Sequence, residues 1–294
     1  MYGECHGHIF MDGVDYLKMK ELYSHGICEE DIRRKLSSYQ RCGVTYFRDG
    51  GDHFGAGMFA RKIAGEYGIT YSCPVYAIHK NGRYGSIVGR GFSDLREYHA
   101  LVKEVREKNG DFIKVMFSGI MDFAGDGCVT GTPLSREEIH EMIHIAHEEG
   151  FAVMAHVNGS RAIRDAIEGG VDTIEHGNLM DEDCLQALAQ SDTVWVPTHV
   201  TIANLLGDGR FPREVICRLQ KLQSEAIRRA FSLGARIALG SDAGAYRVPH
   251  GTGIEDEYRA FLKITRDLMK PEELDRILRE GEMQIRRLFP GNGI

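Results

Sequence analysis

Two short segments, Ala152-Val153-Met154-Ala155-His156 and Thr173-Ile174-Glu175-His176, are apolar runs of strand length that each end on a histidine. Residues 161–168, which lie between them, have the amphipathic period of a helix. A strand, a helix and a second strand in this order predict two parallel strands joined by a right-handed crossover. The carboxyl ends of such strands lie at the same edge of the sheet, so His156 and His176 are expected to be neighbours.

The same alternation of strand and helix extends over the whole chain. Strands are expected at residues 4–9, 44–48, 71–78, 112–117, 152–156, 173–176, 193–197 and 236–241. Helices are expected at residues 29–42, 56–67, 94–108, 136–149, 161–168, 182–190 and 213–233, and in the remainder of the chain. A doubly wound open sheet would show the same alternation. Eight units with polar residues at strand ends favour a closed α/β fold, the TIM (β/α)8 barrel, and a single domain over residues 1–294.

Charge, apolar runs and cysteine spacing argue against several kinds of protein. The chain has 294 residues, 43% of them apolar, and a formal net charge of −7, which argues against nucleic acid as a partner. No apolar run reaches the roughly 20 residues that cross a bilayer, and the first residues lack the features of a signal peptide. Seven cysteines without Cys-x-x-Cys spacing argue against disulfides and a cysteine zinc site. We expect a cytoplasmic protein with a small-molecule substrate; a homo-oligomer is an open possibility.

The first expected strand contains two histidines, His6 and His8. Side chains two apart on a strand point to the same face, so the two imidazoles could chelate a divalent cation such as zinc. Histidines that are hydrogen-bonded within the core are an equally good explanation of the pair taken alone.

Lys114 lies inside the apolar segment Phe112-Ile113-Lys114-Val115-Met116 and shares a face with Phe112 and Met116. That face is expected to line the barrel interior, where burial would lower the pKa of the lysine and leave a nucleophilic amine. Such an amine can react with carbon dioxide to give a carbamate, which can bridge two metal ions. A lysine that reaches the barrel mouth or pairs with an acidic residue is the alternative.

Asp242 follows the eighth expected strand, which in a closed barrel lies beside the first strand and its two histidines. Six potential ligands thus fall inside strands or at their carboxyl ends, where barrel enzymes have their active sites. They are His6, His8, Lys114, His156, His176 and Asp242.

The chain resembles the amidohydrolase superfamily, in particular its binuclear members with a carboxylated lysine on the fourth strand. Within that superfamily it looks like the branch of imidazolonepropionase-like proteins and zinc-dependent Xaa-Pro and Xaa-Arg dipeptidases. The motifs that carry the resemblance are Gly43–Asp49, Asp111–Lys114, Ala155-His156-Val157-Asn158-Gly159, Gly170–Asn178, Val196-Pro197-Thr198 and Gly240-Ser241-Asp242-Ala243-Gly244.

The resemblance implies a centre with two divalent metal ions, most commonly zinc. His6, His8 and Asp242 would hold the more buried ion, His156 and His176 the other, and carboxylated Lys114 would bridge them together with a hydroxide. Asp242 would take a proton from the attacking hydroxide and deliver it to the leaving amine, which makes it the catalytic acid–base group.

Two features depart from the pattern of these relatives. They carry a small β-sandwich built from segments on both sides of the barrel, whereas only five residues precede His6 here, so a barrel without the sandwich is expected. Close dipeptidase relatives have a tyrosine near the position of Asn158. Asn158 is therefore a candidate substrate contact that distinguishes this chain.

A second potential zinc motif is His140-Glu141-Met142-Ile143-His144, which matches the His-Glu-x-x-His pattern of zincin proteases. The metzincin extension requires a histidine where this chain has Gly150. In the barrel this segment is an outer helix, and we expect its histidines to lie on a partly solvated face.

Substrate contacts should come from the loops that follow the strands. The candidates, besides Asn158, are Arg83, Tyr84, His199 and Arg247, and the two arginines could bind a carboxylate. The sequence favours a hydrolase of amide C–N bonds in dipeptides, N-acyl amino acids or cyclic amides. A lactonase or phosphotriesterase with the same metal ligands and a non-catalytic binding barrel are the alternatives.

Overall fold

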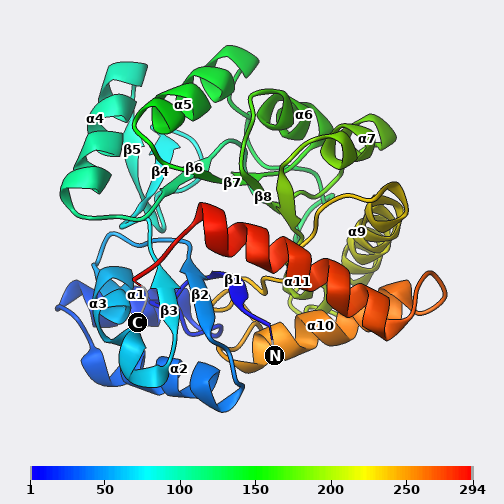
Figure 1. Cartoon of the computed structure of the whole chain (residues 1–294), viewed down its shortest axis with the longest axis horizontal. Helices are drawn as coiled ribbons and strands as arrows, with labels where there is room; N and C mark the ends of the chain where they lie inside the picture. The colour runs from blue at the N-terminus through cyan, green and yellow to red at the C-terminus, as the bar shows by residue number, and fades with distance from the viewer. Residues whose placement is uncertain (1, 293–294) are drawn as a thin grey trace.

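The computed structural model describes residues 2–292 and shows parallel strands surrounded by helices (Figure 1). The strands form two sheets with the orders β1-β2-β3 and β5-β4-β6-β7-β8-β9. Their bounds are β1 Glu4–Gly7, β2 Tyr46–Asp49, β3 Thr70–Ser72, β4 Ala77–Lys80, β5 Gly89–Phe92, β6 Ile113–Met116, β7 Val153–Val157, β8 Thr173–His176 and β9 Val194–Val196.

The helices follow the strands on the outside of the barrel (Figure 1). Their bounds are α1 Tyr16–Ser24, α2 Glu29–Arg41, α3 Ala56–Ile63 with a 3-10 turn at Ala64–Tyr67, α4 Leu95–Glu107, α5 Arg136–Glu148, α6 Ser160–Glu168, α7 Glu182–Gln190, α8 Val200–Ala203, α9 Arg213–Leu233, α10 Thr252–Thr265 and α11 Pro271–Leu288.

Residues 236–243 close the barrel. On one side Trp195 N donates to Arg236 O (2.9 Å) and Ala238 N donates to Trp195 O (3.0 Å). On the other side Cys5 N donates to Leu239 O (3.2 Å) and Asp242 N donates to His6 O (2.7 Å). The eighth segment therefore lies between β9 and β1, and the predicted TIM-like barrel is confirmed.

The third expected strand, residues 71–78, is divided into β3 and β4. Val75 adopts a positive φ of 70°, which a β-branched residue rarely does, and this interrupts the strand. The kinked segment still joins its neighbours, because Cys73 O accepts from Asp111 N (2.9 Å) and Val75 O accepts from Asp52 N (3.2 Å). After β4, the chain forms an additional strand, β5, which pairs with β4 in parallel. The sequence analysis did not predict this strand.

The expected eighth strand, residues 236–241, is present only as isolated bridges, Ile237 to Trp195 and the following Ala243 to Gly7. The remaining expected elements are present with shifted ends, and two helices were not expected. The first strand ends at Gly7 instead of residue 9. Helix α1 was not predicted because its amphipathic pattern is weak. Only Met19 and Tyr23 are buried in the core, whereas the apolar Leu17 is 72% exposed. Helix α8 has only four residues, too few for a periodic pattern.

The inside of the barrel changes from apolar to polar along the strands. A buried cluster near the amino ends includes Tyr46, Phe112, Met154 and Val194, and the end of α11 closes it with Ile285 and Phe289. Figure 1 shows α11 crossing the barrel on this side. Two residues further along the same strands stand the charged or polar side chains of Arg48, Lys114 and His156. The apolar layer supports the polar one and leaves the carboxyl ends of the strands for a site.

Residues 2–292 contain no β-sandwich. Among the helices of this described part, none has both the length and the apolar character required to cross a membrane.

Candidate metal centre

The six potential ligands converge at the carboxyl end of the barrel. His6, His8, Lys114, His156 and His176 are buried, and Asp242 lies among them with its side chain 15% exposed. The ring centroids of His6 and His8 are 5.5 Å apart, those of His6 and His176 5.0 Å, and those of His156 and His176 4.6 Å. Strand ends far apart in the sequence thus bring four imidazoles into one cluster.

His6, His8 and Asp242 form the tightest group. Asp242 Oδ1 lies 3.5 Å from Nε2 of His6 and 3.5 Å from Nε2 of His8. One ligand atom from each residue lies within 4.8 Å of the others, and no second group of this kind occurs within residues 2–292. His6 Nε2 is buried without a hydrogen-bond partner. A buried polar atom without a partner is costly, so this nitrogen fits a metal ligand.

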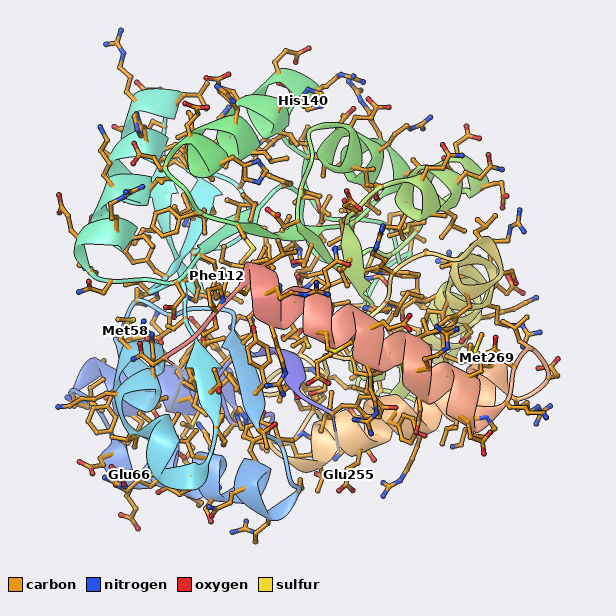
Figure 2. The ribbon with its side chains drawn as sticks, in the orientation of Figure 1. Met58, Glu66, Phe112, His140, Glu255 and Met269 are labelled. Atoms are coloured by element: carbon orange, nitrogen blue, oxygen red, sulfur yellow. The ribbon has the colours of Figure 1, made fainter. Side chains whose placement is uncertain are left out.

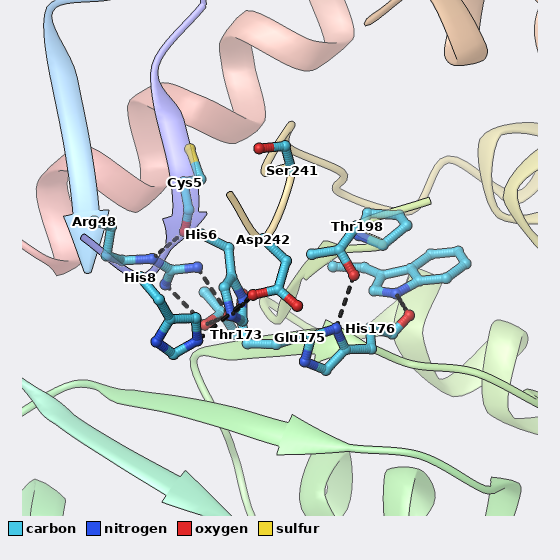
Figure 3. A network of polar contacts seen from close by, with 12 residues as sticks. Cys5, His6, His8, Arg48, Thr173, Glu175, His176, Thr198, Ser241 and Asp242 are labelled. Carbon is cyan, nitrogen blue, oxygen red and sulfur yellow. Dashed lines mark hydrogen bonds and ion pairs between the residues drawn. The ribbon is translucent and has the colours of Figure 1, made fainter. Parts of the chain in front are cut away.

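Glu175 fixes the orientation of the His6 ring (Figure 3). Its Oε2 lies 2.6 Å from His6 Nδ1, and its Oε1 accepts from Arg48 Nη2 (2.8 Å) and Thr173 Oγ1 (2.6 Å). A carboxylate at Nδ1 requires the proton there and leaves the lone pair on Nε2, which faces Asp242. This arrangement is typical of histidines that bind metal ions in proteins.

The other two histidines each have one ring nitrogen engaged. His156 Nε2 donates to Gly119 O (3.0 Å), and His176 Nδ1 lies 2.7 Å from Thr198 Oγ1 (Figure 3). Burial lowers the pKa of His8 and His156 to about 3 and the pKa of His6 and His176 well below its usual value. The imidazoles are therefore neutral at pH 7, the form that binds a cation.

Lys114 is 1% exposed, and its Nζ has no hydrogen-bond partner. Burial lowers the pKa of Lys114, while the carboxylate of Glu175 opposes this shift. Burial raises the pKa of Asp242, and the ammonium of Lys114 opposes that. A buried amine without a partner in the midst of ligands fits a lysine that becomes a carbamate, because the carbamate would supply an anionic oxygen donor.

The backbone is strained at three strand ends of the site. His176, Thr198 and Asp242 have positive φ values of 66°, 49° and 60°. Residues other than glycine rarely adopt this conformation, and such outliers concentrate at functional sites. His176 ends β8, Thr198 follows β9 and Asp242 follows residues 236–241, so the unusual backbone lies where these segments enter the site.

Arg48, Thr173 and Glu175 are supporting residues to which the sequence analysis gave no role. Arg48 is fully buried, and its Nε and Nη1 also donate to Cys5 O (2.7 Å) and Thr173 Oγ1 (2.9 Å). The available signal was a pair of opposite charges at inward positions of two expected strands, β2 and β8. The contact between them could not be inferred because β2 and β8 are not neighbours in the barrel.

The His140–His144 motif lies on the outer helix α5, as expected; Figure 2 shows His140 at the edge of the molecule. His140 Nε2 donates to Asp165 O (2.9 Å), and His144 is exposed. The helix buries its other face, formed by Ile139, Met142, Ile143 and Ala146.

Of the five candidate substrate contacts, the structure places two in the cleft above the cluster and three away from it. Tyr84 and Asn158 line the cleft above the cluster. Asn158 Nδ2 donates to Gly119 O (3.0 Å), and its Oδ1 accepts from Asn178 N (3.0 Å). The side-chain amide therefore links the two loops that contain Gly119 and Asn178.

The other three candidates lie away from the cluster. Arg83 lines a separate hollow beside Thr130, and Arg247 pairs with Asp208 Oδ2 (2.9 Å). His199 lines a hollow between α8, α9 and α10, and its Nδ1 bonds Gln223 Oε1 (2.8 Å). The arginine that does line the cleft is Arg210, in a loop where the sequence analysis singled out no residue.

The cleft has two compartments that meet at His156, His176 and Asp242. The smaller has a volume of about 190 Å³, and its apolar walls are Ile120, Met121, Phe123, Leu205 and Phe211. The larger has a volume of about 590 Å³ and contains the remaining ligands, with apolar walls of Met11, Val14, Tyr16, Leu17, Ile87 and Val88. Tyr84, Ala245 and Tyr246 line both.

Comparison with known proteins shows similarity over nearly the entire chain. Residues 4–278 match the amidohydrolase family. An uncharacterized protein of Mycobacterium tuberculosis is 29% identical over 179 residues, which are 58% of this chain and 46% of the relative. The chain thus spans about half the length of the curated relatives it matches.

Solved structures share the fold. A Xaa-Pro dipeptidase with bound methionine in the active site has a TM-score of 0.74 and 20% identity, with 98% of this chain and 75% of that chain covered. A prolidase in complex with N-methylphosphonate-L-proline has a TM-score of 0.73 and 21% identity, with 100% of this chain and 76% of that chain covered.

Proposed function

Because the chain belongs to the amidohydrolase family, we propose that it is a binuclear metal-dependent hydrolase of amide bonds. The observation that carries this proposal is the pair of buried nitrogen atoms without partners that lie within the ligand cluster, His6 Nε2 and Lys114 Nζ. Neutral imidazoles, a carboxylate and an amine that can become a carbamate are together the donor set of a site for two divalent cations.

His6, His8 and Asp242 would hold one ion, and His156 and His176 the other, with carboxylated Lys114 between them. Zinc is the favoured metal because four of the six ligands are imidazoles. When bound, two such ions lower the pKa of water and polarise a carbonyl group. Lys114 Nζ would form its carbamate by attack on the carbon of carbon dioxide, with formation of one N–C bond and release of one proton.

Asp242 would act as the acid–base group. Its carboxylate stands at the boundary of both compartments, where a scissile bond over the cluster would lie. It would take the proton of the attacking water and return it to the leaving nitrogen. Glu175, Gly119 O and Thr198 Oγ1 would keep three of the histidine rings in the orientations that this geometry needs.

Arg210 supports an amide with a free carboxylate as the substrate. Arg210 lines the larger compartment, and its guanidinium lies 4.5 Å from the ring centroid of Tyr246 and 5.3 Å from that of Phe211, two residues that line the smaller one. A guanidinium binds a carboxylate through two charge-assisted hydrogen bonds. The solved dipeptidase and prolidase, which hold methionine and a phosphonate of proline, are consistent with such a ligand.

A lactonase or phosphotriesterase could use the same ligands. Arg210 favours the amide, because a carboxylate-bearing substrate is natural for amino acid derivatives and absent from neutral lactones and triesters. A purely binding barrel is disfavoured by the position of Asp242 in the tightest ligand group, where an acid–base role needs it.

The first test measures zinc content and amide hydrolysis of the full chain and of Lys114→Ala. The parent should bind zinc at both sites and hydrolyse part of a library of dipeptides and N-acyl amino acids. Lys114→Ala should lose hydrolysis and most of the bound zinc, because two adjacent cations need an anionic bridge. An active Lys114→Ala chain would refute the carbamate, and a parent without bound metal would refute the hydrolase.

The second test concerns Arg210. For a hydrolysed substrate, kcat/KM should fall at least about tenfold when its carboxylate is replaced by a carboxamide, as expected for a lost charge-assisted contact. Arg210→Met should abolish this preference, whereas Arg83→Met should retain it, because Arg83 lies outside the cleft. If Arg83→Met removes the preference and Arg210→Met does not, the carboxylate contact is wrongly placed here.

A further inference from the structure

The larger compartment has an unusual wall for an enzyme of small polar substrates. Val14, which precedes α1, and Leu17, in its first turn, are each 72% exposed, and both line this compartment. A single exposed apolar side chain carries no information. Two of them on the rim of a cleft, continuous with Met11, Ile87 and Val88, form an apolar surface that leads directly to the ligand cluster.

The position of α1 is fixed from its other side. Met19 and Tyr23 are buried, and Tyr23 OH donates to Asp31 Oδ2 on α2 (2.8 Å). On a helix with 3.6 residues per turn, Leu17 stands well away from the face of Met19 and Tyr23. The packing that holds α1 therefore directs Leu17 to the cleft and leaves it uncovered.

The charges of the larger compartment favour an uncharged acyl group over the amino-terminal residue of a dipeptide. A dipeptide has a free ammonium group next to its amino-terminal residue, and this group needs an acceptor. Apart from Asp242 in the cluster, Asp15 is the one carboxylate among the described residues of the wall. Asp15 is exposed at the start of α1, where its Oδ1 caps the helix by accepting from Lys18 N (3.1 Å). An uncharged acyl group fits these walls better than an ammonium.

The volumes of the two compartments are consistent with an acyl group in the larger one and an amino acid side chain in the smaller one. Cavities of roughly 300–1,000 Å³ receive drug-sized ligands, and the larger compartment of about 590 Å³ falls in this range. The smaller compartment suits one apolar side chain, and Phe123 and Phe211, with ring centroids 5.7 Å apart, would contact it. Arg210 lines the larger compartment beside Tyr246 and Phe211 of the smaller one, and it would bind the carboxylate of the same amino acid.

We propose that the substrates are N-acyl amino acids with a long apolar acyl chain and an apolar amino acid. The acyl chain lies in the larger compartment against Val14 and Leu17, and the amino acid side chain lies in the smaller one. This assignment rests on the proposed amide hydrolysis, and it deepens that proposal by naming the substrate class.

The test uses the zinc-loaded full chain and a series of N-acyl-L-phenylalanines from acetyl to decanoyl. Matching phosphonate analogues, in which phosphorus replaces the scissile carbonyl carbon, provide a binding constant by calorimetry that does not depend on turnover. Both kcat/KM and affinity should rise up to about fourfold for each added methylene, which corresponds to about 0.8 kcal/mol. Alanyl-L-phenylalanine should be a poorer substrate than the butanoyl compound.

The test variant is Val14→Ser with Leu17→Ser, and Leu22→Ser on the same helix is its control. Leu22 is 39% exposed and lies outside the cleft, and all three sites tolerate serine because they face solvent. The double variant should lose most of the dependence of kcat/KM on chain length, so that its difference from the parent grows from the acetyl to the decanoyl compound. Leu22→Ser should behave as the parent with every compound.

The outcomes separate this inference from the proposed function. Amide hydrolysis that is independent of chain length, or a dependence that survives in the double variant, would overturn the acyl site and leave the hydrolase intact. Phosphonates that bind more tightly with chain length to a protein that cleaves none of the amides would support the acyl site and overturn the hydrolase.

Discussion

The chain contains two pairs of histidines with the spacing of a zinc site, and they lie in very different surroundings. His6 on β1 and His8, the residue after β1 ends, are buried at the mouth of the barrel, and each has a buried ring nitrogen without a hydrogen-bond partner. On α5, His144 is exposed, and His140 donates to a backbone carbonyl (Figure 2). The spacing of each pair is the one that places two side chains on the same face, of a strand for His6 and His8 and of a helix for His140 and His144.

The difference shows what a metal motif needs beyond spacing. A third ligand must come from another element, and a second contact must orient each ring. β1 has both, because residues 236–243 lie beside it and supply Asp242, while Glu175 reaches His6 from across the barrel. α5 packs its apolar face inward, so its histidines meet solvent and a helix terminus.

The largest expected difference between the two pairs is in metal binding. His8→Asn should weaken zinc binding by more than about a hundredfold, because the loss of a ligand should exceed the effect of losing a supporting contact. His144→Asn should leave both the affinity and the amount of bound zinc unchanged. Zinc titration of the metal-free chains checks this, and the opposite pattern would make α5 the metal site.

A smaller difference is expected in catalysis. Asp242→Asn should lower kcat by at least about a hundredfold, the usual effect of losing an acid–base group. Zinc content must be measured on the same sample, since Asp242 is also a ligand. Glu141→Gln, which removes the general base of the alternative motif, should keep kcat within a few-fold of the parent. Equal losses in the two variants would contradict our assignment of the proton transfer.

The smallest expected effect tests the support of His6. Glu175→Gln should weaken zinc binding by about tenfold, the lower end of the range for residues that orient metal ligands. Glu257→Gln is the matched control, because Glu257 is also fully buried and accepts from His199 N and Val200 N (both 2.8 Å) away from the cluster. The control should lower the melting temperature without changing zinc affinity. If both variants bind zinc equally well, Glu175 supports only the fold.

The two buried lysines, Lys35 and Lys114, differ in the same way as the two histidine pairs. Lys35, 2% exposed, donates to Asp31 Oδ2 (2.6 Å) and Ile9 O (2.8 Å), so its charge is satisfied within the fold. Lys114, 1% exposed, has neither kind of partner. Both residues of a satisfied ion pair contribute to structure, whereas an unsatisfied amine indicates a ligand or a modified group.

The sequence by itself determined the features that depend on periodicity within one segment. Lys114 between Phe112 and Met116, the pair His6 and His8, and the histidines that end β7 and β8 were all recognised in this way. Together with eight strand–helix units, they predicted the barrel, the end that carries the site and the members of the cluster. A side chain at an inward position of a parallel strand can only meet the other inward side chains, so this part of the structure follows from local pattern.

Only the tertiary structure decided which side chains meet across the barrel and which loop residues enter the cleft. The contact of Glu175 with His6 depends on barrel closure and register, and the division of the third strand depends on the unusual backbone of Val75. Arg210 lines the cleft while Arg83 and Arg247 do not, and Leu17 faces it because Tyr23 and Met19 anchor α1. These outcomes depend on packing between segments distant in the chain, and no pattern within one segment carries that information.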